Sequence, residues 1–144
     1  MSRLRRWFAG SRMVGEFSFL FDGALIWALT GAVVALASPA PALLAGLSPP
    51  ARVFFQAGIG FGFGWWCGLP WSFAFALSAR AYTPAPPVAT LRRITWFAVT
   101  GFAAVALTAR LTGLAMVACI GLGVVVATLA ARVGLARAAH RQRG

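Results

Sequence analysis

The stretch ITWFAVTGFAAVALTARLTGLAMVACIGLGVVVATLAARV, residues 94–133, decides the fold of this chain. Its forty residues carry only two charges, Arg110 and Arg132. At 1.5 Å per residue, one helix of this length would be about 60 Å long, twice the hydrocarbon thickness of a bilayer. The stretch therefore predicts two short membrane spans, at about residues 94–110 and 113–133, which turn back at Arg110-Leu111-Thr112-Gly113.

Two further apolar segments precede this hairpin, at about residues 14–37 and 53–79. The segments that connect them, residues 38–52 and 80–93, contain seven prolines. Proline lacks an amide proton and restricts the residue before it, so both connections are expected to be loops. We therefore predict an all-α polytopic membrane protein, a single domain over residues 1–144 with four transmembrane helices.

Composition excludes an ordinary soluble domain. Hydrophobic residues make up 60% of the chain and charged residues 10%, whereas soluble domains carry about 25% charged residues. The net charge of +11 does not indicate nucleic-acid binding, because hydrocarbon-length segments separate the arginines and leave no contiguous basic face. Anionic lipid headgroups are the expected partners of these charges, and no nucleic-acid partner is expected.

The arginines also predict the orientation. The chain has thirteen and no lysine. Four precede the first span, three lie in the second connection and four lie from Arg132 to the C-terminal end, whereas only Arg52 and Arg110 fall on the other side. Because cytoplasmic loops retain arginine, this eleven-to-two division places both termini in the cytoplasm. We predict a multi-pass protein of a bacterial-type inner (plasma) membrane.

The second span carries a stripe of glycines. Gly60, Gly64 and Gly68 recur every fourth residue and would form a groove on one helix face, where another helix can approach closely. The alternative is a flexible or broken helix beside a substrate path, because Pro70 follows and removes a backbone hydrogen bond. Helix packing is the favoured interpretation.

Asp22 is the candidate functional residue of the first span. A helix that begins near Met13 places it about 13 Å deep, and one that begins at Phe17 places it about 7 Å deep. An intramembrane carboxylate is expected to face protein or water, in either a functional or a structural hydrogen-bonding role. Its candidate partners are Arg110, Gln56, Ser78 and a carbonyl freed by Pro70.

The chain offers little for catalysis. The one histidine, His140, lies in the C-terminal segment, and no Cys, His, Asp and Glu cluster suits a metal. No base stands near a serine in the sequence for nucleophilic catalysis. We therefore expect a protein that is not an enzyme and has no metal and no cofactor.

The segment Met13-Val14-Gly15, followed by Asp22 and Trp27, resembles the opening of the GtrA-like family. These are small four-span proteins associated with moving polyprenyl-phosphate-linked sugars across the membrane. In that family a Val-Gly pair near the inner face is followed, seven residues after the glycine, by an aspartate. Gly15 and Asp22 have this spacing.

The end of the second span is similar in outline to the family's Asn-Phe-x-x-Asn-Arg-Arg-x-x-Phe pattern, with Arg80 in the place of one arginine. The asparagines are absent here, an alanine replaces the other arginine, and the second half of the chain is shorter than the family's. The resemblance implies a bundle that handles polyprenyl phosphate. Gly15, Asp22 and Arg80 are then the residues expected to bind lipid.

Two hypotheses of function follow. The first is translocation, or flipping, of a polyprenyl-phosphate-linked sugar. The second is a structural or assembly subunit of a larger respiratory or photosynthetic membrane complex, favoured by the lack of catalytic groups and the small mass outside the membrane. The second hypothesis implies other membrane subunits, or further copies of this chain, as partners.

Overall fold

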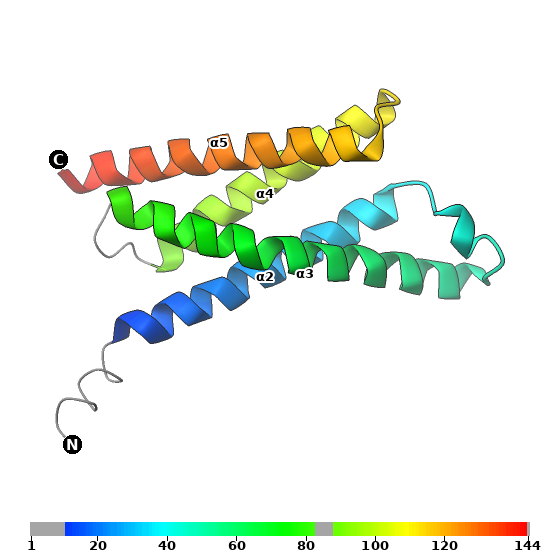
Figure 1. Ribbon diagram of the computed structural model, residues 1–144, viewed down its shortest axis with the longest axis horizontal. Helices are drawn as coiled ribbons and strands as arrows, with labels where there is room; N and C mark the ends of the chain where they lie inside the picture. The colour runs from blue at the N-terminus through cyan, green and yellow to red at the C-terminus, as the bar shows by residue number, and fades with distance from the viewer. Residues whose placement is uncertain (1–10, 83–87, 144) are drawn as a thin grey trace, which may run out of the picture.

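The structure is a computed structural model that describes residues 11–82 and 88–143. It is all-α, and 90% of the described residues are helical. The elements are α2 (Ser11–Ala37), the short 3-10 helix η1 (Ala42–Leu44), α3 (Pro49–Tyr82), α4 (Val88–Leu111) and α5 (Met116–Arg143) (Figure 1).

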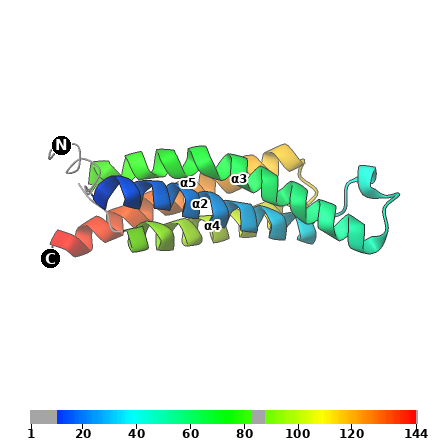
Figure 2. The same ribbon diagram turned by 90° about the horizontal axis from the view of Figure 1, so that it is seen from below.

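Successive long helices run in opposite directions (Figure 1). The start of α2, the end of α3, the start of α4 and the end of α5 therefore lie together, and we call this the arginine-rich end. The other end, with η1 and the α4–α5 turn, is called the hairpin end. The first turns of α3 extend past the other helices there (Figure 2).

The four helices form two hairpins that share one core. α2 packs mainly against α3, α4 packs mainly against α5, and α2 also contacts α4. The core combines residues of all four helices, among them Phe19, Phe75, Val99 and Leu135. Many other large apolar side chains remain exposed on the outside, as expected for helices that face lipid and not water.

Three segments are long and apolar enough to cross a membrane: Ser18–Ala37, Val88–Leu111 and Val117–Arg141. They indicate a multi-pass membrane protein. α3, with 34 residues, is longer but is not among these three.

Several predicted boundaries were wrong, because the helices extend beyond the apolar runs. α3 begins at Pro49, so the two prolines expected in a loop occupy its first turn, where the missing amide protons are not needed. Arg80 lies in α3 and Arg92 and Arg93 lie in α4, although a loop was expected there. The prolines of that connection fall within residues 83–87, outside the described part. The last two helices, of 24 and 28 residues, are also not short.

The predicted turn of the last hairpin is confirmed. α4 ends at Leu111, and Gly113 follows with a φ of +85°. Glycine adopts this left-handed backbone without the steric penalty of a side chain, and this is a common way for a helix to end. Arg110 lies on the last turn of α4 and is exposed.

Two polar side chains of α3 hold the connection between α2 and α3. The Gln56 amide donates hydrogen bonds to the carbonyl oxygens of Ala35 and Ser38, the latter at 2.8 Å. Arg52 donates to the carbonyl of Ala45 at 2.9 Å. Gln56 thus gives a side-chain donor to two carbonyls at the end of α2 and just after it. Both side chains have structural roles at the hairpin end, far along the bundle from Asp22.

Candidate functional site

The glycine stripe of α3 faces α2. A Cβ atom on Gly64 would lie 2.7 Å from the carbonyl carbon of Trp27, and one on Gly68 would lie 2.5 Å from the Trp27 Cβ. A Cβ on Gly60 would meet the backbone of Gly31. Real Cβ atoms essentially never make contacts below 3.0 Å, so only glycine fits at these positions and the two backbones touch along this stripe. The intervening Gly62 has nothing within 4 Å.

α3 is not broken at Pro70, so the favoured interpretation of the glycine stripe, helix packing, holds over the alternative of a broken helix. α3 continues as one helix from Pro49 to Tyr82, with Pro70 inside it. Tight packing against α2 explains how the helix tolerates the lost hydrogen bond, because neighbouring helices support such residues in membrane proteins.

The tryptophans of α2 and α3 differ in burial and do not form a simple aromatic belt. Trp27 is buried and packs edge-on to Phe102, with ring centroids 5.0 Å apart, and at 5.3 Å from Trp71. Trp71 packs against the core. Trp66 is 76% exposed.

Asp22 forms an ion pair with Arg92, which joins α2 to α4. The Arg92 Nε donates a hydrogen bond to Asp22 Oδ2 at 2.7 Å, and its terminal nitrogen pairs with the same oxygen. The Asp22 side chain is 29% exposed and the Arg92 side chain is 49% exposed. None of the expected partners is correct: Gln56 caps α2, Ser78 donates to its own helix at Ala74, and Arg110 lies at the hairpin end.

The pair lies between the arginine-rich end and the middle of the bundle. Asp22 is eleven residues after Ser11, where α2 begins, and Arg92 is four residues after Val88, where α4 begins. At 1.5 Å per residue, these positions are about 16 Å and about 6 Å along their helices. α2 begins before either of the two starts from which the expected depths were calculated, so the depth of Asp22 in the membrane stays a prediction. From the first turns of a membrane helix, an arginine such as Arg92 can extend its side chain to the headgroups.

Of the other predicted lipid-binding residues, Gly15 lies in the second turn of α2 and Arg80 in the last turn of α3. Their helical positions place both at the arginine-rich end, as for Asp22. Their side chains, like that of Glu16, lie outside the part whose surroundings the structure describes.

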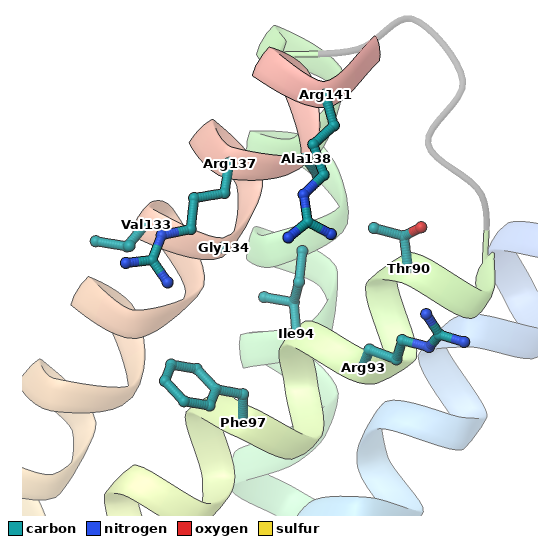
Figure 3. Close-up of a pocket in the computed structure, with 9 residues that line it drawn as sticks. All are labelled: Thr90, Arg93, Ile94, Phe97, Val133, Gly134, Arg137, Ala138 and Arg141. Atoms are coloured by element: carbon teal, nitrogen blue, oxygen red, sulfur yellow. The ribbon is translucent and has the colours of Figure 1, made fainter.

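A second cluster of charge lies between α4 and α5 at the same end (Figure 3). It lines a cleft of about 420 Å³. The lining residues are Thr90, Arg93, Ile94, Phe97, Val133, Gly134, Arg137, Ala138 and Arg141. The Arg141 side chain points from α5 toward Ile94 of α4, the Arg137 side chain extends toward Val133, and the Arg93 side chain points away from both (Figure 3). We call this the arginine cleft.

The sequence did not lead us to the pairing of Arg92 with Asp22 or to the arginine cleft, although the spacing of two cleft arginines was informative. Arg137 and Arg141 are four residues apart, a spacing that places them on one helix face. Pairing that face with Arg93 and Phe97 required knowing how α4 packs on α5. Within residues 11–82 and 88–143, no group of three His, Cys, Asp or Glu residues is placed to hold a metal ion.

Comparison with known proteins gives no further identification: no family model, curated protein or solved structure matches this chain. The resemblance to the GtrA-like family therefore stays an inference from the spacing of Gly15 and Asp22 and from Arg80.

Proposed function

We propose that the chain crosses a bacterial-type inner membrane four times, with both termini in the cytoplasm. Two observations support this. Successive helices alternate in direction, so that α2 begins and α5 ends on the same side (Figure 1). α3, with 34 residues, is about 51 Å long and lies in backbone contact with α2, so it accompanies that span across the bilayer. The arginine-rich end then faces the cytoplasm, as loop arginines do.

We also propose that the protein assists the translocation of a phosphate-bearing lipid, and specifically a polyprenyl-phosphate-linked sugar, the class that the family resemblance implies. The observation that carries this proposal is the Asp22–Arg92 pair. It links the α2–α3 hairpin to the α4–α5 hairpin, and both of its side chains are partly exposed.

Arg92 can exchange the carboxylate of Asp22 for the phosphate of a lipid. Arginine binds carboxylate and phosphate oxygens with the same planar array of donors. A lipid phosphate that takes the place of Asp22 on Arg92 therefore removes one link between the hairpins. Release of the phosphate re-forms the link. Headgroup binding and separation of the hairpins are in this way coupled through Asp22 and Arg92, which act by binding and not by covalent chemistry.

Reconstitution tests this function. We expect vesicles that contain the purified protein to expose a fluorescent short-chain polyprenyl-phosphate sugar faster than protein-free vesicles, measured by quenching from the outside. A fluorescent phosphatidylcholine serves as the control lipid and should move at the protein-free rate. Equal acceleration of both lipids would indicate non-specific scrambling. No acceleration, together with recovery of the chain in a stoichiometric membrane complex, would support the subunit hypothesis instead.

A further inference from the structure

The arginine cleft is a site that the proposed exchange at Asp22 does not use. It lies between α4 and α5, and its polar and apolar residues are separated along its length. Arg137 and Arg141 follow Val133 on α5, which runs toward the arginine-rich end. Phe97 lies further along α4, toward the hairpin end, than Arg93. The cleft is therefore basic at the membrane surface and apolar deeper in (Figure 3).

The charge of the cleft is uncompensated among its described lining residues, which include three arginines and no acid. Arg137 and Arg141 are one helical turn apart and repel each other, because like charges at this spacing destabilise a helix. An anion bound between their guanidinium groups relieves this repulsion and gains charge-assisted hydrogen bonds. The two positive charges of Arg137 and Arg141 favour a doubly charged anion over a singly charged one.

The apolar part of the cleft indicates that the anion belongs to a lipid. Phe97 is 64% exposed and Val133 is 48% exposed, and both line the cleft below the arginines. An acyl or prenyl chain can lie along these two side chains while its phosphate remains at the arginines. A free phosphate ion has no hydrocarbon chain and cannot make these contacts.

From this arrangement we propose that the arginine cleft binds the phosphate of a lipid phosphomonoester, with Arg137 and Arg141 as its main ligands, and the hydrocarbon chain along Phe97 and Val133. The site goes beyond the proposed function, because the phosphate of a polyprenyl-phosphate-linked sugar is a diester and the cleft suits a monoester; it rests on that function for placing the cleft at headgroup depth. It holds the lipid beside, and separate from, the Asp22–Arg92 pair.

Binding to the purified full-length chain in detergent tests the site, with dioctanoyl phosphatidic acid as the phosphomonoester probe. Arg137→Gln and Arg141→Gln should each raise its Kd about tenfold, the loss expected for a hydrogen bond between charged groups. Arg132→Gln is the matched control, because Arg132 is an exposed arginine of α5 outside the cleft. It should leave the Kd within about twofold, since exposed charges are screened.

Two further probes identify the source of the phosphate. Dioctanoyl phosphatidylglycerol, a singly charged diester, and inorganic phosphate, which has no chain, should both bind more weakly than phosphatidic acid. Equal binding of either probe, or an equal loss in Arg132→Gln, would overturn the proposal. Asp22→Asn should keep the wild-type Kd. Intact binding without translocation would remove the proposed function alone, and translocation without cleft-dependent binding would remove this site alone.

Discussion

Leucine in place of Gly64 is expected to prevent α2 and α3 from packing, whereas leucine at Gly62 should leave the fold intact. A Cβ on Gly64 already overlaps the backbone of Trp27, and the remaining leucine atoms have no room. Because the obstacle is backbone and not a flexible side chain, we expect a loss of about 3 kcal/mol or more, the upper part of the range for overpacked sites.

Gly62 is a matched control, since it lies two residues away on the same helix with nothing within 4 Å of an added Cβ. Both substitutions add the same apolar side chain to α3. The measurement is the yield of monodisperse protein in detergent and its melting temperature. Equal behaviour of the two variants would contradict close packing of α2 on α3 through this glycine.

Asp22→Asn and Asp22→Ala are both expected to reduce translocation to the protein-free rate, while the Asn variant stays folded. Asparagine keeps the shape and hydrogen-bonding capacity of the side chain but removes the charge that holds Arg92. Partly exposed ion pairs contribute only about 0–1 kcal/mol to stability, so losing this one should not unfold the bundle. Arg92→Gln should have the same effect on translocation, because it removes the group that exchanges carboxylate for phosphate.

Translocation in reconstituted vesicles and the melting temperature in detergent separate a functional role from a structural one. Arg132→Gln again serves as the control, since it removes an arginine of α5 that lies neither in the pair nor in the cleft. If Asp22→Asn translocated lipid at the wild-type rate and only Asp22→Ala destabilised the protein, the pair would be purely structural.

The sequence was sufficient to predict the helical class and the turn of the last hairpin. Long apolar runs predict helices, and the turn depends on the local backbone conformation of Gly113. The four-residue spacing of Gly60, Gly64 and Gly68 also indicated a close helix contact, and the structure places α2 there. These features depend on helix period and backbone sterics, which one segment of sequence determines.

Helix boundaries and side-chain partners were not predictable in the same way. An apolar run marks only the apolar part of a helix. α3, α4 and α5 continue beyond their apolar runs into turns that carry arginine, and a hydropathy profile does not show that these turns are helical. The partner of Asp22 depends on which helix lies next to α2 and at what height. Arg92 was assigned to a loop, so its pairing across the bundle could not be foreseen.

The orientation of the arginine-rich end is the central claim, because the lipid site and the exchange at Asp22 both require it to face the cytoplasm. An alkaline phosphatase reporter, active only outside the cytoplasm, tests it when fused after Gly113 or after Gly144. The four-span account predicts activity for the fusion in the α4–α5 turn at Gly113 and none for the fusion at Gly144. Activity at Gly144 would contradict the account.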